Sequence, residues 1–371
     1  MGRRTSEVLL LLVISLSLLL LLPTAAATAA AAKAIDASKV QRLELPDSLV
    51  GPESVAFDGR GAGPYVSVAD GRVLRWSGNG NGSGPGWTTY TYSPSYAKNG
   101  CAAPSELPPV ATESSCGRPL GLRFHRRSGT LYVADAYMGL MRVGPGGGEA
   151  TVVATEAGGE PLRFTNGVDR TGEVYFTDSS STYRRSQHQM VTAIGDSTGR
   201  IMRYDPRTGQ VAVLQSGVTY PNGVAVSADG THLVVALTGP CKLLRYWLRG
   251  PKAGTSETLA DLPGYPDNVR PDGKGGYWVA LHREKNEFPF GVNSHLVAVR
   301  IGTQGETLQE MKGPKNVRPT ELVERKGGKI YMGSVELSGE TPQAVLEPIG
   351  VRSSGQNIGK KLVKLVISTR M

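Results

Sequence analysis

The chain has 371 residues, a formal net charge of +9 at pH 7, and an aromatic content of only 6%. Its basic residues are spread along the chain without interleaved aromatics, a pattern that argues against a nucleic-acid partner and indicates a solvated basic surface. Abundant glycine, together with the absence of long helical periodicity after the first 30 residues, favours an all-β class.

The first 30 residues have the pattern of a secretory signal peptide. The basic segment MGRRTSE precedes an apolar run from Val8 to Leu22, and the alanine-rich AAATAAAA offers cleavage sites. The run is shorter than the roughly 20 residues of a bilayer span. We therefore expect residues 1–30 to be removed, with no stable membrane insertion afterwards. Residues 31–371 should form one domain in the secretory pathway, in the vacuole, the ER lumen or the extracellular space.

Three cysteines suit an oxidising compartment with one disulfide. Cys101 and Cys116 flank the loop AAPSELPPVATESS, which has little to bury, so we expect them to be bonded to each other. Cys241 is expected to be a buried free thiol. The sequon at Asn81, within NGNGSGPG, predicts glycosylation on an exposed loop.

One unit recurs six times along the chain. Each copy reads as a short strand, a turn rich in Gly, Asp or Lys, and a second strand of alternating β-branched or aromatic residues. Most copies are followed by a third strand. The copies start at Pro52, Pro119, Thr165, Pro221, Pro266 and Pro319. Repeats of this length predict a six-bladed β-propeller with four-stranded blades around a central channel.

The second residue of each unit is expected to surround the mouth of that channel. These residues are Glu53, Leu120, Asn166, Asn222, Asp267 and Thr320. Glu53, Asn166, Asn222 and Asp267, with the adjacent Asn268, offer only hard oxygen ligands, which suit one Ca²⁺ ion in the channel. The alternative is that Asn and Asp before glycine serve only as turn residues.

Three phrases resemble the plant strictosidine synthase-like family: GRPLGLRFHRRSGTLYVADAYMGL, RFTNGVDRTGEVYFTDSSSTY and RYWLRGPKAGTSE. The resemblance implies a propeller and the Cys101–Cys116 disulfide. Strictosidine synthase itself condenses an amine with an aldehyde, using a glutamate at the start of the sixth inner strand. Here Thr320 aligns with that glutamate and Glu321 is its neighbour. Tyr183 matches a tyrosine of the synthase active site, so Tyr183, Leu120, Thr320 and Glu321 are assigned to the substrate pocket.

The ring residues are also similar to the catalytic calcium ligands of paraoxonases, which belong to a wider propeller group with gluconolactonases. That resemblance implies hydrolysis of an ester or lactone, with Ca²⁺ polarising the reacting oxygen. Paraoxonase histidines on the second blade have no counterpart here, since Leu120 occupies one of those positions. Asp135 and His282 are therefore the candidate catalytic bases. The insertion from Tyr183 to Thr198 is expected to cover the channel mouth.

Three functions follow from these patterns. The first is a monomeric calcium-dependent esterase or lactonase acting on a small molecule. The second is amine–aldehyde condensation with Glu321 as the base. The third is a non-enzymatic protein in which structural Ca²⁺ ties the blades together and the upper surface binds a ligand. Plant relatives include proteins needed for pollen-wall formation, so a role in pollen development or in secondary metabolism is a further expectation.

Overall fold

The computed structural model describes residues 32–34, 43, 45, 46, 49, 51–78, 86–102, 109–286, 295–313, 317–334, 336 and 337. Contacts divide the chain into residues 1–31 and residues 32–371. The predicted signal peptide and Asn81 lie outside the described residues, so both stay predictions. Within the described part of the chain, no helix is long and apolar enough to cross a membrane.

The predicted hairpins form as antiparallel strand pairs. In the third repeat, β13 (Thr165–Arg170) pairs with β14 (Val174–Asp178), and Val168 faces Phe176 across the pair. Both strands are buried nearly throughout, because their sheet packs face to face with a neighbouring sheet on each side. The apolar residues of neighbouring sheets form the core between them, as Leu140 of the second sheet and Val168 and Phe176 of the third do.

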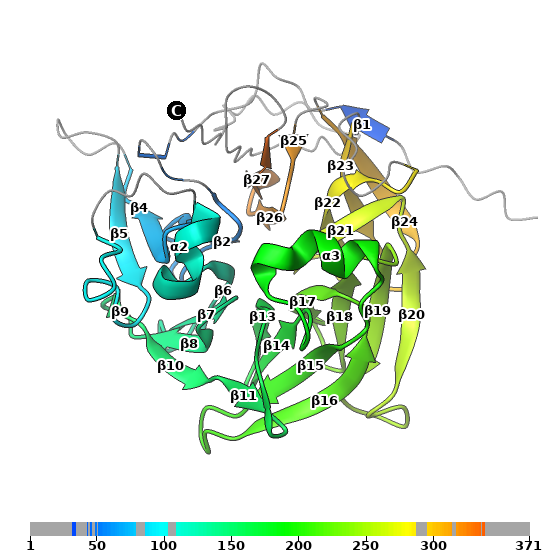
Figure 1. Cartoon of the computed structure of the whole chain (residues 1–371). Helices are drawn as coiled ribbons and strands as arrows, with labels where there is room; N and C mark the ends of the chain where they lie inside the picture. The colour runs from blue at the N-terminus through cyan, green and yellow to red at the C-terminus, as the bar shows by residue number, and fades with distance from the viewer. Residues whose placement is uncertain are drawn as a thin grey trace, which may run out of the picture. The chain divides into compact units, whose positions relative to one another are not determined.

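Within each of the first three large sheets, the strands follow one another in chain order from the channel outwards (Figure 1). The first contains β2 (Val55–Ala56), β3 (Tyr65–Ser67), β4 (Arg72–Trp76), β5 (Trp87–Tyr92) and β9 (Gly148–Glu149). The second contains β6 (Pro119–Phe124), β7 (Leu131–Asp135), β8 (Gly139–Val143) and β10 (Thr151–Ala154). The third contains β13, β14, β15 (Gly199–Tyr204) and β16 (Val211–Val218).

Two further large sheets continue the ring. The fourth contains β17 (Pro221–Val226), β18 (His232–Leu237), β19 (Lys242–Trp247) and β20 (Ser256–Asp261). The fifth contains β21 (Gly264–Pro271), β22 (Tyr277–Glu284), β23 (Leu296–Ile301), β24 (Thr307–Lys312) and, parallel to β24, β1 (Ala32–Ala34).

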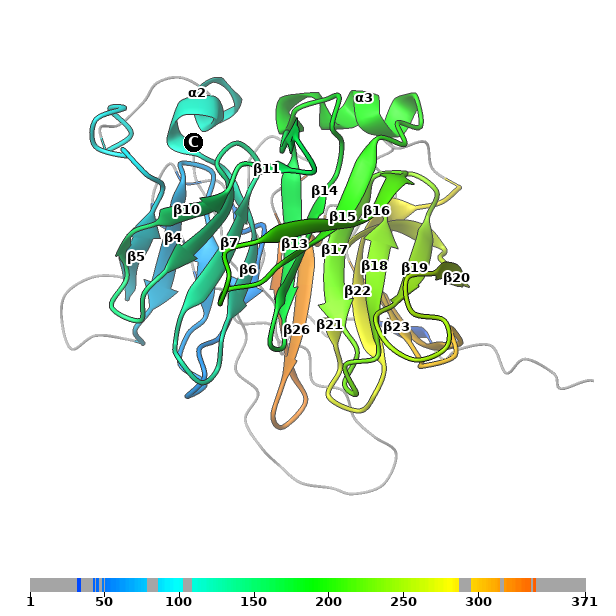
Figure 2. The ribbon, with the colours of Figure 1, turned by 90° about the horizontal axis from the view of Figure 1, so that it is seen from below.

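The remaining elements are short. Three two-stranded sheets pair β11 (Glu156–Ala157) with β12 (Glu160–Pro161), β25 (Val317–Arg318) with β28 (Glu336–Leu337), and β26 (Glu321–Arg325) with β27 (Lys329–Gly333). The helical segments are α2 (Pro109–Cys116), the 3₁₀ turn η2 (Arg185–Gln187) and α3 (His188–Ala193). Both helices lie at the same end of the sheets (Figure 2).

The prediction of an all-β propeller is confirmed, but the prediction of six four-stranded blades is wrong. Five sheets have four or five strands, whereas the sixth repeat contributes only β28 and the β26–β27 pair among the described residues. This pair packs against β21 and β22 on one side and against β2 on the other. It therefore occupies the place between the fifth and first blades, and the ranges that the structure describes add no outer strand to this pair (Figure 1).

A register shift recurs at the start of four inner strands. The pairing register shifts between the first paired residues and the rest of the strand in four pairs: β6 with β7, β13 with β14, β17 with β18, and β21 with β22. A bulge of this kind re-aims the side chains within it. The residues inside these bulges include Leu120, Asn166, Asn222 and Asp267, so the bulge explains why these positions face the channel.

The glycines after the two asparagines have a packing role. A Cβ on Gly167 would lie 2.4 Å from the carbonyl oxygen of Asn222, and one on Gly223 would lie 2.6 Å from Cα of Asn268. Each glycine lets the next inner strand approach closely near the axis. Asn166 and Asn222 lie within strands, so the alternative that their Asn-Gly pairs are turns is wrong.

The cysteine predictions are confirmed. Cys101 and Cys116 form a disulfide, and Cys241 is free and buried. The disulfide joins the last residue of α2 to the chain before it, which fixes this helix near the channel mouth.

Candidate functional site

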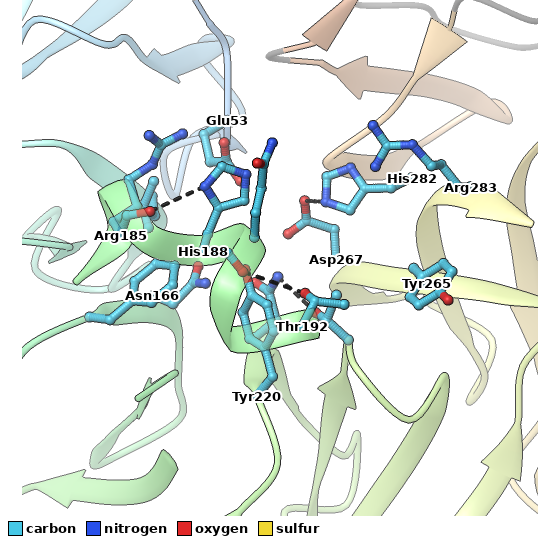
Figure 3. Close-up of a pocket in the computed structure, with 15 residues that line it drawn as sticks. Glu53, Asn166, Arg185, His188, Thr192, Tyr220, Tyr265, Asp267, His282 and Arg283 are labelled. Atoms are coloured by element: carbon cyan, nitrogen blue, oxygen red, sulfur yellow. Dashed lines mark hydrogen bonds and ion pairs between the residues drawn. The ribbon is translucent and has the colours of Figure 1, made fainter. Parts of the chain in front are cut away.

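A pocket at the channel mouth gathers most of the predicted ring. It is a small cavity of about 80 Å³, bordered by inner strands, by the β22 end and by α3 (Figure 3). Its lining residues are Glu53, Leu120, Phe164, Asn166, Arg185, His188, Gln189, Thr192, Tyr220, Asn222, Thr238, Tyr265, Asp267, His282 and Arg283. Six of the residues that the sequence assigned to the site line this pocket together: Glu53, Leu120, Asn166, Asn222, Asp267 and His282.

The two ring asparagines are held in fixed orientations. The Asn166 amide nitrogen donates to Ser179 Oγ at 3.0 Å, and the Asn222 amide nitrogen donates to Thr238 Oγ1 at 3.1 Å. Thr238 and Ser179 in turn donate to carbonyl oxygens at the start of the next inner strands. Both amide oxygens are buried without a hydrogen-bond partner in the described structure. Burying a polar oxygen without a hydrogen bond lowers the stability of the fold unless a ligand or an ion binds that oxygen.

Two carboxylates complete the ring and repel one another. Burial, followed by the charge of Asp267, raises the pKa of Glu53 to about 7. Asp267 is 1% exposed; its Oδ2 lies 2.5 Å from His282 Nε2, and its Oδ1 has no hydrogen-bond partner in the described structure. The pocket thus brings together two acidic side chains and buried oxygens that lack partners. A bound cation would offset the repulsion between the carboxylates and would coordinate the oxygens.

The donor chemistry suits a hard cation. No group of three or more His, Cys, Asp or Glu side chains that could hold a metal occurs among the residues the structure describes. The four ring oxygens instead come from two carboxylates and two neutral amides, a set that Ca²⁺ accepts and zinc does not favour. The residues present therefore fit Ca²⁺, by their unpartnered buried oxygens and by their chemistry.

The predicted cover over the channel mouth is present. The segment η2–α3 contributes Arg185, His188, Gln189 and Thr192 to the pocket, and Val191 is fully buried against Leu120, Phe164 and Tyr220. His188 lies within the insertion from Tyr183 to Thr198 but was not among the predicted site residues. The signal was a polar insertion between two strands of one repeat.

A buried carboxylate fastens this cover to α2. Glu113 is fully buried, and it accepts hydrogen bonds from Tyr137 Oη at 2.6 Å and from Arg185 Nη1 at 3.0 Å. The Ser186 amide donates to Tyr137 Oη at 3.2 Å. Since α2 is held by the disulfide, the cover is anchored to two parts of the chain far apart in sequence.

Five predicted site residues lie outside the pocket lining: Asn268, Tyr183, Thr320, Asp135 and Glu321. Asn268 is buried beside Gly223. Tyr183 packs against the apolar cluster beneath α3. Thr320 is buried and donates to the carbonyl oxygen of Glu53 at 2.7 Å, sealing the first blade to the sixth repeat. Asp135 is fully buried, and its Oδ1 accepts the Tyr137 and Met138 amides at 2.9 Å, so it serves the turn after β7.

Glu321 lies in a deeper layer of the channel. Its two oxygens accept Arg270 Nε and Nη2 at 2.8 and 2.6 Å, and Ser54 Oγ donates to it at 3.0 Å. All three residues are buried. Arg270 also reaches Ser54 Oγ and the carbonyl oxygens of Leu122 and Val168. The Arg270 guanidinium thus connects the inner strands of five repeats, and both carboxylate oxygens of Glu321 accept hydrogen bonds from it.

The fold and the pocket together define a β-propeller with an oxygen-rich site at the mouth of its channel. Two family descriptions match, "Strictosidine synthase" over residues 165–251 and "Strictosidine synthase-like, N-terminal" over residues 38–76. Strictosidine synthase-like protein 3 of Arabidopsis thaliana is 41% identical over 320 residues, covering 78% of this chain and 80% of that protein. Protein 10 of the same series is 41% identical over 319 residues, covering 77% of this chain and 83% of that protein. The chain belongs to the strictosidine synthase-like family.

Solved structures share the fold at low sequence identity. A gluconolactonase from Xanthomonas campestris has a TM-score of 0.56 at 16% identity, covering 81% of this chain and 91% of its own. Regucalcin, a calcium-binding protein from Agrobacterium tumefaciens, has a TM-score of 0.52 at 16% identity, covering 82% and 87%. At these identities the likeness supports the propeller fold alone.

Proposed function

We propose that this protein is a calcium-dependent hydrolase of small esters or lactones. The observation that carries the proposal is the convergence of Glu53, Asn166, Asn222 and Asp267 on one pocket, three of them with a buried oxygen that has no partner in the described structure. The gluconolactonase among the structural neighbours is consistent with this reaction class.

The ring residues would hold the ion, and the other lining residues would hold the substrate. Bound Ca²⁺ would polarise the substrate oxygen and stabilise the negative charge that develops on it. Leu120, Phe164 and Tyr220 supply an apolar wall beside the ring, while Val191 anchors the cover above it. The small cavity favours a compact substrate and limits the water around it.

Proton transfer falls to His282 in this proposal. Its Nε2 contacts Asp267, which orients the imidazole toward the pocket as a carboxylate does in many catalytic pairs (Figure 3). The side chain is 19% exposed and lines the pocket. His188 on the cover is a second imidazole at the same pocket. Asp135 has no part in the proposal, since its Oδ1 serves a turn outside the pocket lining.

The direct test is a calorimetric Ca²⁺ titration of EDTA-treated protein, with hydrolysis of phenyl acetate and a panel of lactones measured in parallel. Binding that switches on turnover is the expected result. Binding that raises the melting temperature without turnover would instead favour a structural ion in a ligand-binding protein. No Ca²⁺ binding would refute the proposal.

Calcium affinity should fall as the pH is lowered. The pKa of Glu53 is raised from 4.5 to about 7, so in the calcium-free protein this carboxyl holds a proton below that pH. Calcium must displace the proton, which weakens apparent affinity by about tenfold per pH unit below the pKa. Titrations at about pH 6 and about pH 8 would show the difference. Glu53→Gln is the matched variant: its affinity should be lower but nearly independent of pH over this range.

The calcium-free protein should show the opposite trend in stability. Because the folded pKa of Glu53 lies above its ordinary value, its stabilising contribution is complete below pH 4.5 and is lost as the pH rises through about 7. A melting temperature that falls over this interval in wild type, and falls less in Glu53→Gln, is expected. An identical pH profile in both proteins would contradict the assignment of Glu53.

Amine–aldehyde condensation is a weaker candidate. It needs Glu321 as a base within reach of substrate. Glu321 is instead fully buried, paired with Arg270 and outside the pocket lining.

A further inference from the structure

A hollow lined by arginines lies at the end of the propeller away from the catalytic pocket. The turns that link β6 to β7 and β13 to β14 lie opposite α2 and α3 (Figure 2). They border a hollow whose lining includes Arg123, Arg126, Arg127 and Arg170. The sequence showed only charge spread along the chain, whereas folding brings these four arginines from two blades to one place.

Two of the four guanidinium groups are held rigidly. Arg123 Nε lies 2.6 Å from Asp169 Oδ1, with 32% of its side chain exposed. Arg170 donates from Nε and Nη2 to the Gly172 carbonyl oxygen at 3.3 and 3.0 Å, and its guanidinium lies 5.0 Å from the centre of the Tyr132 ring. A planar cation already held in place loses little conformational freedom when it binds an anion.

The other two arginines carry charge that no described carboxylate neutralises. Arg126 and Arg127 are exposed, and neither forms an ion pair with any carboxylate in the described ranges. Among the residues that the structure describes, Asp169 is the one carboxylate that forms an ion pair with these arginines, and its Oδ1 and Oδ2 also accept the amides of Arg170 and Val226. Four arginines against one carboxylate leave three uncompensated positive charges.

The backbone around these charges is also tightly packed. A Cβ on Gly59 would lie 2.1 Å from the Arg126 carbonyl oxygen, so the turn of the first blade supports the turn that carries Arg126. After burial, the positive charges of Arg170 and Arg127 lower the pKa of His125 in the same turn. Both facts describe a fixed, electropositive hollow rather than loose surface side chains.

We propose that this hollow binds a phosphate or sulfate group. Arginine matches the planar, multi-oxygen geometry of such anions, and converging guanidinium groups prefer a doubly charged one. The group could belong to a soluble phosphorylated or sulfated molecule or to the headgroup of an acidic lipid. The site is separate from the calcium pocket and does not depend on the proposed hydrolysis.

The test measures inorganic phosphate and sulfate binding at constant ionic strength, so that general screening is not read as binding. Wild type is compared with Arg126→Gln/Arg127→Gln and with Arg249→Gln, an exposed arginine on another blade. Affinity should fall about tenfold or more in the double variant and stay unchanged in the control. Melting temperatures confirm that all three proteins are folded.

A second arm identifies the source of the anion. Sedimentation is measured with phosphatidylcholine vesicles that contain or lack phosphatidic acid. Arginine-dependent binding to inorganic phosphate and to acidic vesicles supports the site with a lipid source, and binding to inorganic phosphate alone supports it with a soluble one. Equal phosphate affinity in wild type and double variant, or no binding of either anion, overturns the proposal.

Discussion

Asp267→Asn is expected to lower calcium affinity by roughly 100-fold or more and to abolish calcium-dependent hydrolysis. The substitution preserves side-chain size but removes one of the two formal negative charges of the ring, and charge count governs affinity at calcium sites. It also weakens the contact that orients His282. Calorimetric titration and initial rates with phenyl acetate measure the two effects.

The same variant should not be less stable than wild type when calcium is absent. Glu53 and Asp267 repel one another in the unliganded protein, and Asn removes that repulsion. Calcium at 100 times the wild-type dissociation constant should stabilise wild type by about 2.7 kcal/mol and the variant, at the same calcium concentration, by much less. Asp261→Asn is the matched control, because Asp261 lies at the end of β20 in the neighbouring blade, with 67% of its side chain exposed. Wild-type calcium affinity in Asp267→Asn would remove Asp267 from the site.

Arg270→Met is expected to produce the largest loss of stability of any variant proposed for this protein, about 3–5 kcal/mol, because it leaves the buried Glu321 carboxylate without its partner. Arg270 and Glu321 side chains are 6% and 0% exposed, and their closest atoms are 2.6 Å apart. Guanidinium chloride unfolding followed by tryptophan fluorescence measures the change in the free energy of unfolding.

The double variant Arg270→Met/Glu321→Leu tests the cause. Replacing both partners with apolar residues removes the stranded charge, so much of the lost stability should return. Lys274→Met breaks the Lys274–Glu324 pair, in which the lysine side chain is 60% exposed. This control should cost less than about 1 kcal/mol. A loss of that small size in Arg270→Met would show that the guanidinium does not hold the inner strands together.

The hairpin repeats and most of the ring could be predicted from the sequence because their determinants are local. Each repeat motif specifies one strand start, and equivalent positions in equivalent units meet at a common axis, as Asn166, Asn222 and Asp267 do. The role of the glycine after each asparagine could not be found this way. Gly167 and Gly223 are needed because the next inner strand passes within contact distance, which only packing reveals.

The number of blades and the position of Glu321 were decided by tertiary structure. The sixth motif predicts a hairpin, and β26–β27 forms it, but sequence repetition does not require further strands to pair with it. Glu321 is one residue from the ring position, yet it turns to Arg270, 51 residues earlier in the chain. Burial explains this pairing, because a carboxylate buried in the channel without a positively charged partner would be strongly destabilising.

What the sequence determined by itself was the repeat, its strand periodicity and the oxygen chemistry at the start of each unit, since these depend on residues close together in the chain. Only the tertiary structure decided which charges meet. It joined Glu113 to Arg185 across 72 residues to anchor the cover, and it gathered arginines of two separate blades into one hollow. Such contacts depend on how the blades close around the axis, and long-range electrostatic pairing of this kind leaves no periodic signal in the chain.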